Sequence, residues 1–185
     1  MKLVILTRDI VITHNPAMPV ESAESWVPVA GSLEAVARLA NAGYHIVAIA
    51  PRSGPAGGLS IEALNRIHEK MYRLAVEAKG LIEAIFFNAG AGSGADLDAS
   101  CFGMLEEIRR RLKTSLQGIP VIGVDERDFQ AVHRMGATPV LVRLGTGETP
   151  TPAAETMTPA ATALIFDDLA ATADYILAQP DTVRQ

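Results

Sequence analysis

A short segment at residues 51–59 combines groups that bind an anion without a metal. Arg52 carries a guanidinium whose N–H donors form a rigid fork, which suits a phosphate or a carboxylate. Ser53 adds a hydroxyl and Gly54 a backbone amide directly beside it. We therefore expect Arg52, Ser53 and Gly54 to form a ligand-binding group. The alternative is an ordinary Arg52 that is solvated or salt-bridged.

Two aspartates near the ends of apolar runs are further candidates for chemistry. Asp9 follows the apolar run at residues 3–6, where a carboxylate can act as an acid or base or can simply cap a loop. Asp128 precedes a helical segment, and a carboxylate there satisfies the helix dipole and the first amides without any metal. For each aspartate the sequence leaves both interpretations open.

These groups must be positioned by short apolar runs that alternate with longer segments of helical period. The apolar runs predict strands at 3–6, 44–50, 82–87, 119–124, 139–144 and 163–166. The helical segments run from Ser32 to Gly43, from Ser60 to Gly80, around Met104 to Leu112, from Phe129 to Met135, and through Tyr175 and Leu177. Ser60 is the predicted N-cap of the longest helix, and Gly80 its predicted end.

This alternation predicts a doubly wound α/β fold, with a parallel sheet between two layers of helices. We expect one domain over residues 1–185, without a large cap domain and with an irregular surface stretch near 146–162. In such folds the functional crevice lies beyond the carboxyl ends of the strands. The loops expected there are 7–30, 51–59, 88–101 and 124–128.

Composition limits the partners and the compartment. The net charge is -5 without a basic stripe, so we do not expect a nucleic-acid partner. The apolar runs fall far short of the roughly 20 residues that a membrane span needs, and no signal peptide is recognisable. The single cysteine, Cys101, excludes an internal disulfide and a cysteine-rich zinc site. We therefore expect a cytoplasmic protein with no membrane partner.

Several segments resemble the motifs of haloacid-dehalogenase-type phosphatases. Residues 3–11 resemble the opening motif, an apolar strand followed by Asp-x-Asp-Gly-Thr or Asp-x-Asp-Gly-Val. Residues 50–54 lie where the branch with heptose-1,7-bisphosphate 7-phosphatase and histidinol-phosphate phosphatase has Thr-Asn-Gln-Ser-Gly. Residues 123–131 lie on its Gly-Asp-x-x-x-Asp-x-x-Ala. Further matches are 26–33, 64–71 and 103–105. The resemblance runs nearly end to end and implies a Rossmann-like fold of that family.

At several positions the chain departs from the family pattern. The resemblance implies the role that the family residue has at each of them. The aspartate that attacks phosphorus is replaced by Thr7, whereas the acid/base aspartate is retained as Asp9. The glycine after it is Ile10. The threonine or serine that holds the phosphoryl oxygens is Ala50, and the lysine that neutralises the phosphate is Ala99.

The metal sites that the resemblance implies are also reduced. The first acidic Mg²⁺ ligand after the fourth strand is Val124, and the second is retained as Asp128. Because carboxylates hold Mg²⁺ together with phosphate and waters, we expect at most weak Mg²⁺ binding. The branch's zinc loop is shortened to residues 88–94, so zinc is not expected. A local shift that brings in Asp125 or Glu126 would restore a ligand, and this alternative stays open.

The joint departures predict a catalytically defective member of the phosphatase family. It would act by binding a phosphorylated small molecule or a protein partner. The alternative is an active hydrolase of phosphorylated sugars, in which Asp9 activates Thr7, because a hydroxyl nucleophile needs a base. A purely structural role, such as a subunit contact in a larger assembly, is a third hypothesis.

Overall fold

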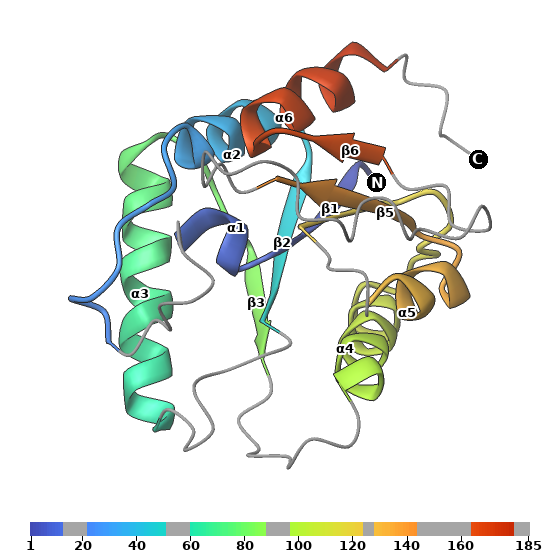
Figure 1. The fold of residues 1–185 in the computed structure, drawn as a ribbon, viewed down its shortest axis with the longest axis horizontal. Helices are drawn as coiled ribbons and strands as arrows, with labels where there is room; N and C mark the ends of the chain where they lie inside the picture. Colours follow the sequence, from blue (N-terminus) through green and yellow to red (C-terminus); the bar gives the residue numbers. More distant parts are fainter. Residues whose placement is uncertain (13–21, 51–59, 88–96, 124–127, 144–163, 180–185) are drawn as a thin grey trace.

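A computed structural model describes residues 1–12, 22–50, 60–87, 97–123, 128–143 and 164–179. The strands of this described part form one parallel sheet in the order β3-β2-β1-β4-β5-β6 (Figure 1). They are β1 (Leu3–Thr7), β2 (His45–Ala50), β3 (Ala84–Phe87), β4 (Pro120–Ile122), β5 (Thr138–Val142) and β6 (Leu164–Phe166). Strand β1 is central and pairs with β2 on one side and β4 on the other. The predicted doubly wound α/β fold is confirmed.

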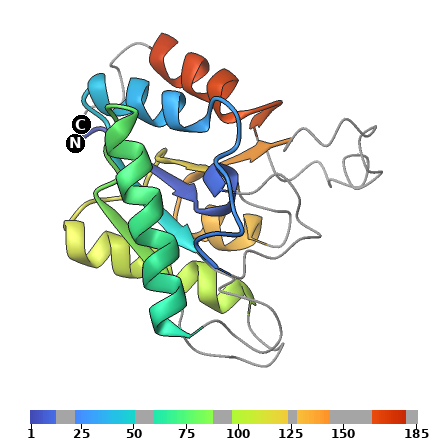
Figure 2. The ribbon, with the colours of Figure 1, turned by 90° about the vertical axis from the view of Figure 1, so that its left-hand side faces the viewer.

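Helices cover both faces of the sheet. They are α1 (Asp9–Ile12), α2 (Ser32–Asn41), α3 (Ile61–Glu77), α4 (Leu97–Leu112), α5 (Phe129–Arg134) and α6 (Leu169–Ala178). Helix α2 packs against α3 and α6, while α4 packs against α5 on the opposite face. Figure 2, turned by 90° from Figure 1, shows the two groups of helices on either side of the sheet. None of the helices in the described residues is long and apolar enough to cross a membrane.

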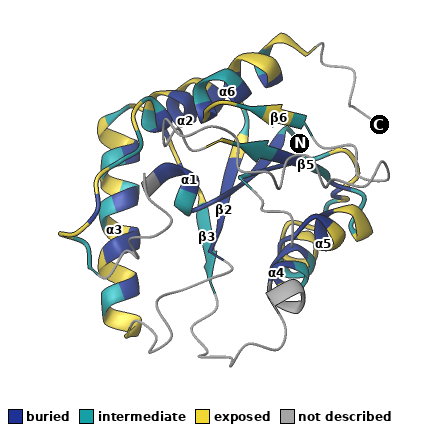
Figure 3. Ribbon diagram, viewed as in Figure 1, coloured by how far each residue is buried: buried dark blue, intermediate teal, exposed yellow. Residues whose placement is uncertain are grey.

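The alternation of side chains along β1 divides the core into two apolar layers. Val4 and Leu6 belong to the layer under α2, α3 and α6, whereas Leu3 and Ile5 belong to the layer under α4 and α5. Every residue of β1 is buried, because helices cover both faces of the sheet (Figure 3). This explains why the strand is continuously apolar in sequence rather than alternating.

The two ends of α3 show what a cap prediction captures and what it misses. The Ser60 hydroxyl accepts a hydrogen bond from the Ala63 amide at 3.1 Å, so the predicted N-cap is confirmed. At the other end the left-handed residue is Lys79, with φ 63°, and not Gly80. Gly80 is needed for another reason, since a Cβ there would lie 2.9 Å from the backbone of Ala37.

Helix α1 occupies the start of the segment that we predicted as a loop over 7–30. A helix of four residues carries too little periodicity to be recognised in sequence. Leu112 is the last residue of α4, as the predicted helical segment implies, and its side chain is 37% exposed there. The irregular stretch predicted near 146–162 lies outside the described residues.

Candidate active site

The central strand β1 ends at the carboxyl edge of the sheet, between the ends of β2 and β4. Thr7 is its last residue and pairs with Ile49 of β2. The next amide, that of Arg8, donates to the Ile49 carbonyl at 2.7 Å, which holds the chain close to β2 as it leaves the sheet. The following residues, from Asp9 onward, form α1. The residues after β1 therefore start in the crevice where this type of fold places its ligands.

Thr7 is buried, with 6% of its surface exposed, and its hydroxyl donates to the Gly123 carbonyl at 3.0 Å. Gly123 lies directly after β4 and has a left-handed φ of 80°. A Cβ on Gly123 would lie 2.5 Å from the Thr7 hydroxyl oxygen and in collision with the Ile10 side chain. We call these three residues the Thr7–Ile10–Gly123 contact. It joins β1, α1 and the end of β4, and it leaves no room for a Cβ on Gly123.

Arg8 and Asp9 form an ion pair at the same edge. The Arg8 Nε and Nη2 atoms both donate to Asp9 Oδ1, at 2.9 and 2.8 Å. The Arg8 side chain is 5% exposed and that of Asp9 45%, so the pair reaches from the interior to the surface. A guanidinium is rarely buried unless it is paired. The sequence does not predict this role for Arg8, because charged residues are ordinarily exposed.

His68 of α3 is a second buried ionisable group that the sequence analysis did not single out. It is 5% exposed and lies against Phe87 at the end of β3, with ring centroids 4.9 Å apart. Burial, and then the positive charge of Arg8, lower the pKa of His68 to about 4, so the ring is neutral at pH 7. A signal for its burial existed, since its spacing from Leu64 and Met71 places it on the apolar face of α3.

Asp128 lies at the start of α5 and is almost fully buried. Its carboxylate makes no capping hydrogen bond with the described backbone of α5, so the expected bonding to the first amides was wrong. The reason is its backbone: φ -85° and ψ -11° are helical, whereas a capping residue needs extended angles to reach the next amides. The metal-binding role of Asp128 stays a prediction.

Comparison with known proteins identifies the family. No family model matches the chain. The D-glycero-beta-D-manno-heptose-1,7-bisphosphate 7-phosphatase of Bordetella bronchiseptica is 37% identical over 179 residues, which span 96% of the chain and 98% of that protein. The enzyme of the same name from Pseudomonas putida is 35% identical over 96% of the chain and 100% of its own length. This chain belongs to the heptose-bisphosphate phosphatase branch of the haloacid-dehalogenase-like family.

Solved structures of the branch agree with the fold described above. The D,D-heptose 1,7-bisphosphate phosphatase of B. bronchiseptica, complexed with magnesium and phosphate, matches with a TM-score of 0.81 and 36% identity, over 96% of this chain and 98% of that chain. The corresponding phosphatase of Burkholderia thailandensis matches with a TM-score of 0.72 and 35% identity, over 97% and 100%. The fold and the relationship to this branch, both expected from the sequence, are therefore confirmed.

The described residues bring together only part of the site that the family resemblance implies. Thr7 and Asp9 follow β1, Ala50 ends β2, Asp128 follows β4, and Ala99 belongs to α4. Arg52, Ser53, Gly54, the segment 88–94, Val124, Asp125 and Glu126 lie outside the described residues. Within the described part, no three His, Cys, Asp or Glu side chains are grouped to hold a metal ion.

Proposed function

We propose that this chain is a catalytically defective member of the heptose-bisphosphate phosphatase branch that acts by binding. Its ligand would be a phosphorylated small molecule, because the relatives' names describe enzymes that act on a sugar bisphosphate. A protein partner is the second candidate. A cytoplasmic location, expected from the composition, is part of the same proposal.

The observation that carries the proposal is the hydrogen bond from Thr7 to Gly123. A nucleophile at this position must present an oxygen lone pair to the phosphorus atom from an open crevice. Thr7 is instead buried, its hydroxyl proton is held by a backbone carbonyl at 3.0 Å, and the Ile10 side chain lies beside Gly123 on the same side. The Thr7 side chain therefore stabilises the fold, as a buried threonine bonded to the backbone does, and is not presented to a substrate.

A rewired hydrolase that uses Thr7 and Asp9 is the alternative, and the geometry favours it less. Asp9 would have to accept the Thr7 proton, but that proton points to Gly123, and Asp9 Oδ1 already accepts two hydrogen bonds from Arg8. For general-base catalysis the two groups must be within hydrogen-bonding reach of each other, directly or through one water.

Magnesium is the cofactor that the family resemblance implies. The residues described at this edge do not fit it: Thr7 is bonded inward, the Asp9 carboxylate is engaged by Arg8, and a hydroxyl is a poorer Mg²⁺ ligand than a carboxylate. Asp128 would be the remaining carboxylate ligand of the family set, and Mg²⁺ binding by it alone would be weak. Mg²⁺ therefore has no part in the binding function proposed for this chain.

The test compares this chain with the B. bronchiseptica enzyme as a positive control. Both are assayed for phosphate release from D-glycero-beta-D-manno-heptose 1,7-bisphosphate and from an aryl phosphate, with and without millimolar Mg²⁺. We expect turnover by this chain to be lower by a factor on the order of 10⁴ to 10⁶, as for enzymes that lose their nucleophile. Binding of the bisphosphate is measured by calorimetry in parallel.

The outcomes separate the candidate functions. Mg²⁺-dependent turnover that disappears in both Asp9→Asn and Thr7→Val would overturn the proposal and establish the rewired hydrolase. Absent turnover with measurable binding of the bisphosphate supports the proposal. Absent turnover and absent binding would exclude this ligand and leave a protein partner or a subunit contact to be sought by sedimentation and co-purification.

A further inference from the structure

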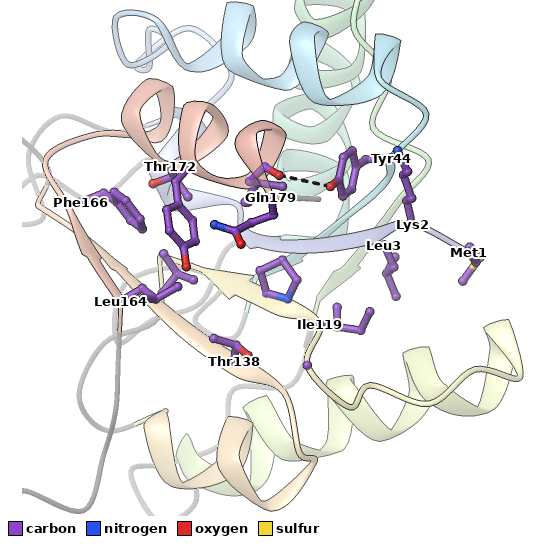
Figure 4. A pocket seen from close by; sticks show the side chains of 15 residues that line it. Met1, Lys2, Leu3, Tyr44, Ile119, Thr138, Leu164, Phe166, Thr172 and Gln179 are labelled. Atoms are coloured by element: carbon purple, nitrogen blue, oxygen red, sulfur yellow. Dashed lines mark hydrogen bonds between the residues drawn. The ribbon is translucent and has the colours of Figure 1, made fainter. Parts of the chain in front are cut away.

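One pocket bounded by described residues lies at the amino edge of the sheet, opposite the candidate active site. A pocket of about 220 Å³ opens there between the first residues of β1, β4 and β5 and the inner side of α6. We call it the amino-edge pocket. Figure 4 shows α6 above it and the strands of the sheet below. It shares no residue with the candidate active site.

The walls of the amino-edge pocket are mainly apolar. They include Ile119, Val140, Leu164, Phe166 and Ile176. Phe166 packs against Tyr175 with ring centroids 5.1 Å apart, so one end of the pocket is aromatic. A cavity of roughly 150 Å³ lined by apolar side chains holds a benzene molecule. The amino-edge pocket therefore has room for one aromatic ring with a short substituent.

The opposite end of the pocket is cationic. Lys2 and Tyr44 line it there, and the Lys2 ammonium lies 5.3 Å from the centre of the Tyr44 ring. No aspartate or glutamate is among the described residues that line the pocket, although the chain as a whole has a net charge of -5. The local charge thus favours an anion at this end.

Two polar groups inside the pocket are available to a ligand. Tyr44 donates to the Ile176 carbonyl and Thr172 to the Asp168 carbonyl, so their hydroxyl protons are engaged. Thr138 and Gln179 also line the pocket, and their side chains make no hydrogen bond with another described residue. Figure 4 shows the Gln179 amide between the Phe166 end and the Lys2 end. A few placed polar groups in an apolar pocket are typical of a ligand site.

We propose that the amino-edge pocket binds a small aromatic monocarboxylate. The ring lies against the apolar walls near Phe166, and the carboxylate points to Lys2 while the Gln179 amide donates to it. This site is separate from the carboxyl edge and goes beyond the proposed function, which concerns phosphorylated ligands. Either proposal can fail without the other.

Phenylacetate serves as the probe, and the uncharged 2-phenylethanol as its matched control. Both are titrated into the isotope-labelled full chain, and amide chemical shifts are followed by NMR. We expect phenylacetate to shift the amides of Thr138, Ile176 and Gln179, with a Kd of about 1 mM or lower, as for a ligand of this size. The amides of Thr7 and Gly123 should not shift. The alcohol should bind about 3- to 10-fold more weakly, because it lacks the charge.

Variants with matched controls test the position of the ligand. Gln179→Trp fills the pocket from an exposed helix end and should weaken phenylacetate binding at least about tenfold, while Ala178→Trp on the neighbouring position should not. Lys2→Gln should remove the preference for phenylacetate over the alcohol, whereas Lys113→Gln, at a residue that does not line the pocket, should keep it. The lack of any shift at 10 mM probe would overturn the proposal, as would unchanged binding in Gln179→Trp. Equal affinity for acid and alcohol in the natural chain would overturn the carboxylate assignment.

Discussion

The two edges of the sheet are built in opposite ways. At the carboxyl edge the described polar groups bond to one another: Thr7 donates to the Gly123 carbonyl, and Arg8 donates to Asp9. Ile10 fills the space that remains beside Gly123. At the amino edge a pocket of about 220 Å³ is open, and Thr138 and Gln179 inside it have no hydrogen bond with other described residues.

The difference shows that a fold class indicates where a ligand pocket usually lies, and that a particular chain can have its open pocket elsewhere. Parallel sheets have crevices at their carboxyl edge because the loops separate there. Side chains can also pack closely at this edge, as Thr7 and Ile10 do beside Gly123. Where side chains are packed closely, substitutions cost stability, and where a pocket is open, they cost little. Four predictions test this contrast.

The largest effect is expected for Gly123→Ala. The left-handed φ of Gly123 lowers the free energy of unfolding of an alanine variant by about 1–2 kcal/mol. The collision of the added Cβ with Thr7 and Ile10 lowers it by about 1–3 kcal/mol more. Gly43→Ala is the matched control, since Gly43 has a φ of 83° and no atom within 4 Å of the added Cβ. Urea unfolding of both variants gives the difference. Equal destabilisation would mean that the carboxyl edge is not closely packed.

The next effect concerns His68, whose folded pKa of about 4 lies below its ordinary value of 6.5. Between these values the unfolded chain binds a proton that the folded chain does not, so stability is lost as the pH falls from 6.5 to 4. The loss over this interval is about 3 kcal/mol, and about 2 kcal/mol between pH 7 and pH 4.5. His68→Leu should remove this part of the pH dependence in urea unfolding, while His45→Gln, on an exposed pair with Glu83, should retain it. The same pH dependence in His68→Leu as in the natural chain would contradict the burial of His68 beside Arg8.

Thr7→Val should have a smaller effect. Valine keeps the shape of threonine but leaves the Gly123 carbonyl without its donor, which costs about 1 kcal/mol of unfolding free energy. Thr114→Val is the control, because the Thr114 hydroxyl makes only a long bond of 3.4 Å to Ser115 and should contribute little. A catalytic threonine would behave in the opposite way, with unchanged stability and lost turnover.

The smallest effect is expected at the open edge. Gln179→Trp adds a large side chain at an exposed helix end beside the amino-edge pocket, so we expect the unfolding free energy to change by less than about 0.5 kcal/mol. A strong loss of stability would show that this pocket is filled by side chains rather than open, and would remove the contrast between the two edges.

Much of the fold was predictable because both faces of the sheet are covered. The short apolar runs and the spaced apolar residues of the long helices gave the order of elements, and Ser60 gave the start of α3. Helix α1 was missed because four residues are too few to show a period. Gly80 was correctly placed after the end of α3. A glycine is required there, however, because a Cβ would collide with the backbone of Ala37 in α2.

The candidate site was predictable only as a set of positions. The resemblance placed Thr7 and Asp9 at the end of the first strand, and the structure puts them there. The sequence could not reveal the partners of these groups, because Thr7 bonds to a residue 116 positions away. The burial of Arg8 was not predicted, since a charged side chain is expected at the surface. The contacts of His68 were not predicted either, because the sequence places it on an apolar helix face but does not show which residues pack against it.

The central position of β1 also affects how the chain is synthesised. Strands β2 and β3 leave the ribosome soon after β1 and can pair on one side, but the other side must wait for β4. The delay corresponds to the 116 positions that separate Gly123 from Thr7, roughly 10 s at ordinary rates of translation. During that time the most buried strand of the finished protein has an unpaired backbone edge on the nascent chain. Aggregation during synthesis is therefore expected to start from β1.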